Sequence, residues 1–166
     1  MKNLIIASVV VFAASASFAQ NKSIVPSPEE KKNDSIITKT IISPTVVESQ
    51  SDNSEPDWNK LNEEVSAQYG ASYGPRTVTR CKIYFYYQVQ NWSGFCAALV
   101  EYTNKYEDAN DAALMNKNAR LILQKSTDKN EMKEALNWNK YALRKDASNE
   151  AYKKTSADLE AKIKSM

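Results

Sequence analysis

The feature that most limits the fold of this chain is a helical spacing of apolar residues that begins near Ser54. From there apolar residues recur every three or four positions, as on one face of an α-helix; the first such set is Trp58, Leu61, Val65 and Tyr69. Similar stripes continue to the C-terminal end and predict about six helices with short links. Because short links make neighbouring helices antiparallel, we expect an all-α fold of stacked antiparallel hairpins.

Capping residues and glycines mark the expected ends of these helices. Ser54 is followed by Asp57, an acid three positions on, which predicts a helix N-terminus there. Gly70 is predicted to end that helix. Asn91 is predicted to mark the turn of a later hairpin, with a new helix from Trp92. These signals define a helical domain over residues 54–166.

The first 19 residues have the pattern of a secretory signal peptide. Lys2 precedes a short apolar run, and small residues at Ser17 and Ala19 suit cleavage after Ala19. The run is too short for a comfortable membrane span, so we expect no stable membrane insertion after cleavage. The predicted location is periplasmic or secreted.

Residues 20–53 differ from the rest of the chain in composition. They are rich in Ser, Thr, Pro, Lys and acids and contain neither Gly nor an aromatic residue. Such a segment buries too little apolar surface to offset its ordering entropy, so we expect a disordered linker. The stretch "SIITKTIIS" alternates weakly and, as an alternative, could add an edge strand to a partner's sheet.

Composition argues against several classes of function. The chain has no His, which removes the usual general base and the commonest zinc ligand. Losing the signal peptide takes one of 22 basic residues and none of 20 acidic ones, so no basic excess favours nucleic acid. We therefore expect a protein that is not an enzyme and has no cofactor, no metal site and no nucleic-acid partner.

Two cysteines, Cys81 and Cys96, remain in a chain expected to be exported, where disulfides persist. In a hairpin turning near Asn91 they would be offset by roughly 7 Å along the helix axis. Added to the spacing between helices, this offset exceeds the reach of a disulfide. We expect two buried free thiols.

The aromatic run from Tyr84 to Tyr87 follows helical, not strand, spacing. Consecutive residues on a helix point about 100° apart, so they cannot form one stacking platform. We expect Phe85 in the core and the three tyrosines at its flanks with their hydroxyls toward water. Arg80, Tyr84 and Tyr87 are the predicted contact residues if this region binds a partner.

The stretches "DWNKLNEEVSAQYG", "CKIYFYYQVQNWSGFCAALVEYTNKY" and "STDKNEMKEALNWNKYALRKDASNEAY" carry a family resemblance. They resemble the helical, tetratricopeptide-like region of exported thioredoxin-like proteins of Bacteroidetes-type bacteria. Asp57-Trp58 and Asn91-Trp92 lie about 34 residues apart, the period of such helical pairs. The chain has no thioredoxin-fold domain, so the resemblance implies a scaffold and a compartment but no oxidoreductase activity.

The sequence thus predicts an exported, non-catalytic helical-repeat protein that mediates protein–protein interaction in the cell envelope, where a thioredoxin-like protein is one candidate partner. One alternative is a thiol-redox accessory of a separate thioredoxin-fold partner, using Cys81 and Cys96. Another is a glycan-binding tether. Asp34-Ser35-Ile36 also resembles an O-glycosylation acceptor motif of such bacteria, which makes Ser35 a candidate modification site.

Overall fold

The computed structural model describes residues 25–52 and 54–166, and the regular structure of these residues is entirely helical. The expected all-helical fold is confirmed at this level. The elements are α1 (Pro28–Ile37), the π-helical η1 (Thr38–Ile42), α2 (Ser43–Ser51), α3 (Trp58–Tyr69), α4 (Tyr73–Gln88), α5 (Trp92–Tyr106), α6 (Ala112–Lys125), α7 (Lys129–Lys145) and α8 (Glu150–Ser165). The predicted signal peptide, residues 1–19, lies outside the described residues.

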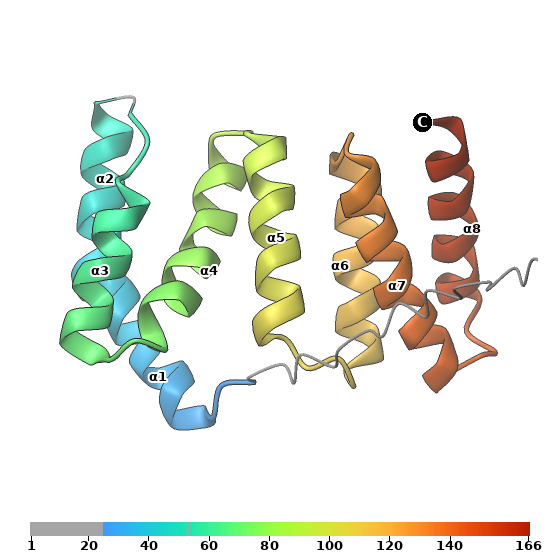
Figure 1. Ribbon diagram of the computed structural model, residues 1–166, viewed down its shortest axis with the longest axis horizontal. Helices are drawn as coiled ribbons and strands as arrows, with labels where there is room; N and C mark the ends of the chain where they lie inside the picture. Colours follow the sequence, from blue (N-terminus) through green and yellow to red (C-terminus); the bar gives the residue numbers. More distant parts are fainter. Residues whose placement is uncertain (1–24, 53) are drawn as a thin grey trace, which may run out of the picture.

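The helices from α3 to α8 follow one another along the long axis of the molecule, and each packs against the next (Figure 1). The elements α1, η1 and α2 form one continuous helical segment that packs against α3 and α4. Contacts of α5 with α7 and of α6 with α8 show that the later helices overlap in two layers. From α3 to α8 there are six helices, the number expected between residues 54 and 166. Packing is extensive between α4 and α5 and between α6 and α7, but much thinner between α5 and α6. None of the helices in the described ranges is long and apolar enough to cross a membrane.

Side-chain caps begin most of these helices. Asp57, Asn91, Asp111 and Asp128 each accept a hydrogen bond from a backbone N–H in the first turn of the helix that follows. The first predicted helix starts later than expected, with Asp57 and not Ser54 as its cap. Gly70 ends α3 as predicted, at a φ of 104° that side chains rarely adopt.

Asn91 offers a local test of this capping. Its Oδ1 accepts a hydrogen bond of 3.0 Å from the N–H of Gly94. We expect Asn91→Ala to lower the free energy of unfolding by about 1 kcal/mol, because an N–H at the start of α5 loses its partner. Urea denaturation would measure the change. The exposed Asn59→Ala in α3 is the control, with an expected change within about 0.5 kcal/mol, and equal losses in both variants would contradict the capping role.

Residues 25–52 form a helical arm, which overturns the expected disordered linker and its edge-strand alternative. Pro28 occupies the first turn of α1, and Ser27 and Glu30 form a reciprocal capping box before it. Ile37 and Ile42 are 0% and 1% exposed. The prediction failed because it counted only apolar residues within the segment, whereas α3 and α4 supply the surface that these isoleucines cover. Below, "the arm" means residues 25–52.

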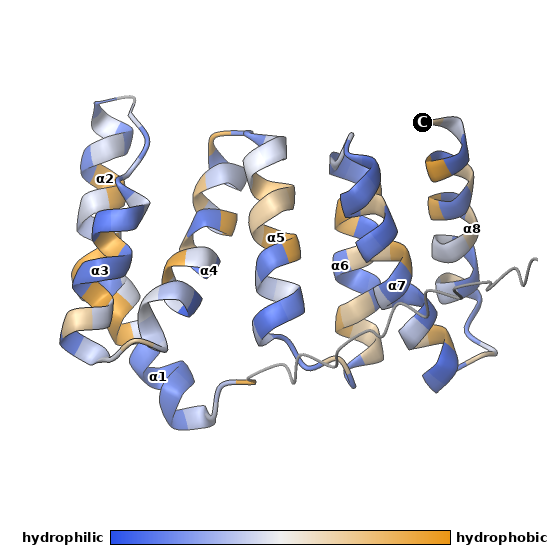
Figure 2. Cartoon of the chain, in the orientation of Figure 1, coloured by the Kyte–Doolittle hydropathy of each residue, from blue (hydrophilic) through white to orange (hydrophobic). Residues whose placement is uncertain are grey.

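Two groups of buried side chains hold the helices together. The N-terminal core lies among the arm, α3 and α4 and contains Ile37, Ile42, Trp58, Leu61, Val65, Val78, Cys81 and Phe85. The C-terminal core lies among α5 to α8 and contains Phe95, Cys96, Leu99, Met115, Ala119, Ile122, Met132, Ala135, Trp138, Ala142 and Leu159. The helices carry both apolar and polar residues, because one face of each helix is buried and another is exposed (Figure 2).

Candidate functional site

A groove of about 860 Å³ runs between α4, α5 and α6, with the arm along one side. It lies where the packing of α5 against α6 is thin. Its walls come from α1, α4, α5, α6 and the loop before α6. A concave surface of this size, with apolar walls and a few polar groups, is the usual form of a binding site.

The three contact residues predicted from sequence, Arg80, Tyr84 and Tyr87, all line this groove. They share it because spacings of four and three residues place side chains on one helix face. Tyr84 is 66% exposed and Tyr87 54% exposed. The half-buried Arg80 donates a hydrogen bond of 3.4 Å to the hydroxyl oxygen of Thr38 in the arm.

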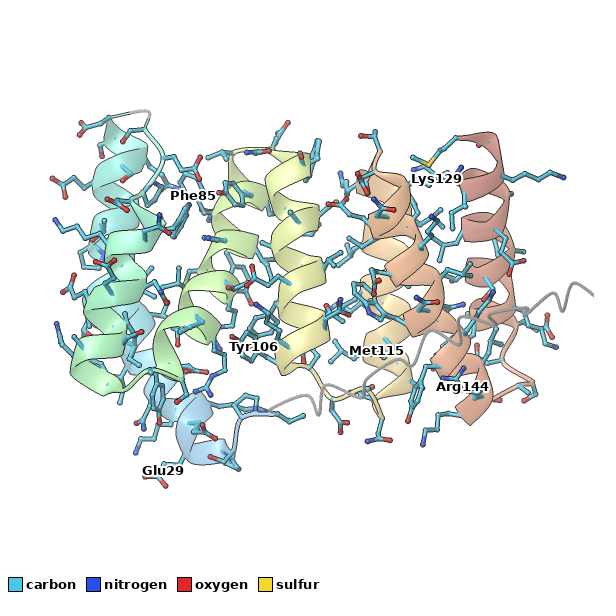
Figure 3. The ribbon with its side chains drawn as sticks, in the orientation of Figure 1. Glu29, Phe85, Tyr106, Met115, Lys129 and Arg144 are labelled. Carbon is cyan, nitrogen blue, oxygen red and sulfur yellow. The ribbon has the colours of Figure 1, made fainter. Side chains whose placement is uncertain are left out.

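The other two aromatic residues of the run lie away from the groove. Phe85 is buried in the N-terminal core, as predicted, on the side of α4 that faces α3 (Figure 3). The hydroxyl of Tyr86 donates a hydrogen bond to the carboxylate of Glu55 at an exposed position. Burial, together with this carboxylate, raises the pKa of Tyr86 to about 12.

Part of the groove is aromatic and aliphatic. Tyr87 packs edge-on against Trp92, with ring centroids 5.7 Å apart, and against Phe95 at the same separation. Ile83, Leu99 and Leu121 extend this surface from three helices. Tyr87 is therefore held in place by its neighbours, while Tyr84 projects further into solvent.

The groove also carries charges of both signs. Lys31, Arg80 and Lys117 line it together with Glu107, Asp108 and Asp111. Asp111 also caps α6, and Asp108 accepts a hydrogen bond from the N–H of Asn110. Burial raises the pKa of Glu107, while the three cations oppose the rise.

The raised pKa of Glu107 makes stability depend on pH. The folded state holds this proton more tightly than the unfolded chain, whose carboxyl has the ordinary value of 4.5. Stability from this group is therefore present at low pH and should be lost as pH rises from 4.5 through the higher folded-state pKa. We expect Glu107→Gln to remove the loss in free energy of unfolding that this group causes as pH rises. Denaturation curves from about pH 4 to about pH 8 would measure it. The exposed Glu63→Gln should retain it, and superimposable curves for wild type and Glu107→Gln would refute the effect.

Ser35, the candidate modification site, also lines the groove. It is exposed on α1, and its hydroxyl donates a hydrogen bond to the carbonyl of Lys31. The expected setting was an accessible, flexible linker. Ser35 is accessible, but it lies in a helix and not in a flexible linker. The neighbouring Asp34 is buried, so an enzyme that must contact both residues would have to unfold the arm.

Cys81 and Cys96 are buried and unbonded, as predicted. They lie in different cores. Burial raises the pKa of Cys96 to about 12 and also raises the pKa of Cys81. Since the thiolate is the reactive form, both features work against the redox alternative, which needs exposed and reactive thiols.

The feature that sequence reasoning missed is a buried cluster around Arg76, between the arm and α4. Arg76 and Asp34 are each 1% exposed, and two nitrogens of the guanidinium donate to the Asp34 carboxylate. The sequence shows that the arm contains several charged residues. The residues next to Asp34 in sequence give no sign that this acid is the buried one. Across the described ranges, no group of acidic and cysteine side chains is arranged to hold a metal ion.

Together these elements define an all-helical protein with one mixed aromatic and charged groove beside an N-terminal arm. No family model matches the chain, and neither a curated protein nor a solved structure matches it.

Proposed function

We propose that this chain is an exported, non-catalytic helical-repeat protein, and that its groove binds a segment of a protein partner in the cell envelope. The helical pairs would be of the tetratricopeptide-like kind that the sequence resembles. Rows of antiparallel helices of this kind offer extended concave surfaces to partners. The expected signal peptide supports the location, and a thioredoxin-like protein is one candidate partner.

The observation that carries the proposal is that Arg80, Tyr84 and Tyr87 line one groove with a continuous apolar surface beside them. Tyrosine and arginine are the residue types most enriched at the energetic centres of protein interfaces. Tyr84 and Tyr87 expose large ring surfaces that burial in a complex would stabilise. The charged residues of the groove would set the orientation of the bound segment.

Site-specific photo-crosslinking would test this proposal in the intact exported protein. A photoreactive aromatic amino acid replaces Tyr84 in the groove or Tyr69 in α3, which is 38% exposed and does not line the groove. We expect one defined protein adduct from position 84 and none from position 69, because only the first position lies in the proposed interface.

A binding measurement with the cross-linked partner then gives the decisive comparison. We expect Tyr84→Ser to weaken binding by about tenfold or more, since truncation of a central aromatic residue costs about 2 kcal/mol. Tyr69→Ser is the matched control and should leave affinity unchanged. Equal affinities for Tyr84→Ser and wild type, with both proteins folded by circular dichroism, would refute the groove as the binding site.

A further inference from the structure

The arm is attached to the rest of the protein through few side chains. In α1 only Asp34 and Ile37 are buried, and η1 contributes only Ile42. No residue of α2 is buried. Pro26, before α1, is also buried, and Ile41 and Val46 pack partly buried against the N-terminal core. This is less buried apolar surface than either core contains, so local opening of the arm costs less free energy than global unfolding.

Polar contacts supply much of this attachment, and they converge on Arg76 of α4. Its Nη2 donates to Asp34 Oδ1 at 2.8 Å, and its Nη1 donates to Glu30 Oε1 at 3.1 Å. The hydroxyl of Thr77 donates to the same Asp34 oxygen at 2.9 Å. Asn33 adds a hydrogen bond of 3.1 Å to the hydroxyl oxygen of Tyr73.

The buried ion pair fixes the position in which the arm docks. Its contribution to the free energy of docking is small. The attraction between the charges is largely offset by the cost of removing them from water. Once the arm moves away, both charges regain their hydration. The docked position is therefore well defined, while the ion pair itself adds little net free energy to docking.

The same arm closes the groove and covers one thiol. Val25, Pro26, Lys31 and Ser35 form the arm's side of the groove. The hydroxyl of Thr38 lies 3.7 Å from the sulfur of Cys81. Displacement of the arm would thus widen the groove and expose Cys81, whereas Cys96 would stay buried in the C-terminal core.

A change of helix type lies within the arm. Between α1 and α2 the backbone adopts the π-helical form over Thr38–Ile42. Short π-helical segments inside α-helices are rare and occur often at functional sites. Here the segment separates the part of the arm that carries Asp34 from α2, which has no buried residue.

We propose that the arm is a displaceable wall of the groove, held by the Arg76 cluster, that opens in the folded protein without unfolding of α3 to α8. The docked arm gives the narrow groove seen in the structure, and the open arm gives a wider one. The inference concerns the arm alone and holds whether or not the groove binds a partner.

Thiol labelling of the ligand-free wild-type protein tests the proposal. Displacement of the arm exposes Cys81, whereas Cys96 is exposed only when the C-terminal core opens. Labelling is followed by mass spectrometry at increasing urea concentrations below the unfolding transition. We expect Cys81 to react at least tenfold faster than Cys96, with a shallow dependence of its rate on urea, because arm opening exposes little surface. Equal rates at the two thiols, or a Cys81 rate as steep in urea as global unfolding, would overturn the proposal.

Two matched carboxamide variants test the role of the Arg76 cluster. Glu30→Gln weakens a contact of Arg76 at the half-exposed edge of the cluster. We expect it to raise the Cys81 labelling rate several-fold and leave the Cys96 rate unchanged. Glu101→Gln, which breaks the exposed pair with Lys105 on α5, should change neither rate. An unchanged Cys81 rate in Glu30→Gln would show that this cluster does not hold the arm.

Discussion

Removal of residues 25–52 is expected to destabilise α3 and α4, which stay folded at low denaturant but lose the cover of the arm. The deletion takes away Ile37 and Ile42, which are fully buried against Leu61, Val65 and Val78. Truncating one such isoleucine to alanine costs about 2–5 kcal/mol. A chain that begins at Ser54 should therefore unfold at much lower denaturant concentration than wild type.

Labelling of the two thiols, combined with guanidinium denaturation, would measure this effect. In the shortened chain Cys81 should react much faster than in wild type, because the arm no longer covers it, whereas Cys96 keeps protection from the C-terminal core. A chain that begins at Val25 is the control, since it retains every contact described for the arm. If the chain from Ser54 unfolds like wild type and Cys81 stays protected, the arm is a dispensable linker after all.

Asp34→Ala is expected to produce the largest effect of any single substitution in the arm. It leaves the guanidinium of Arg76, which is 1% exposed, without its main partner. Breaking a buried ion pair in this way costs about 3–5 kcal/mol, because one charge stays buried and uncompensated. Urea denaturation followed by tryptophan fluorescence would give the change in free energy of unfolding.

A combined variant separates two quantities. One is the cost of leaving Arg76 buried without a partner, and the other is the net contribution of the Arg76–Asp34 pair to stability. Asp34→Leu with Arg76→Met and Thr77→Val replaces the whole buried polar cluster by apolar groups, and should recover most of the loss. Asp158→Ala, which breaks the exposed pair between Lys154 and Asp158, is the control and should change stability by less than about 1 kcal/mol. A small loss for Asp34→Ala, similar to that control, would mean that water reaches the Arg76 cluster.

The helices from α3 to α8 could be predicted from sequence because their signals are local. Apolar spacing, Asn91 before α5 and the terminating Gly70 all act within one or two turns of the chain. The free, buried state of Cys81 and Cys96 followed from the same geometry. Part of the candidate site followed as well, since Arg80, Tyr84 and Tyr87 share a face of one helix.

The rest of the groove depends on residues far apart in the chain. Leu121 and Lys117 of α6 line the same groove as Tyr87 and Arg80 because α6 packs beside α5. The hydrogen-bond partner of Tyr86 could not be predicted from the residues near it in sequence. Glu55, 31 residues earlier, is brought to its hydroxyl by the packing of the chain before α3 against α4.

The sequence by itself determined that residues 54–166 are helical, that one helix ends at Gly70 and another begins at Trp92, and that Phe85 is buried. Only the tertiary structure decided that residues 25–52 are an ordered arm. The physical reason is that Asp34 is stabilised by Arg76, 42 residues away, and Ile37 by a surface that α3 and α4 create together. The composition of a segment shows how much apolar surface it can bury by itself. The arm is ordered because other helices supply the surface and the charged partner against which it packs.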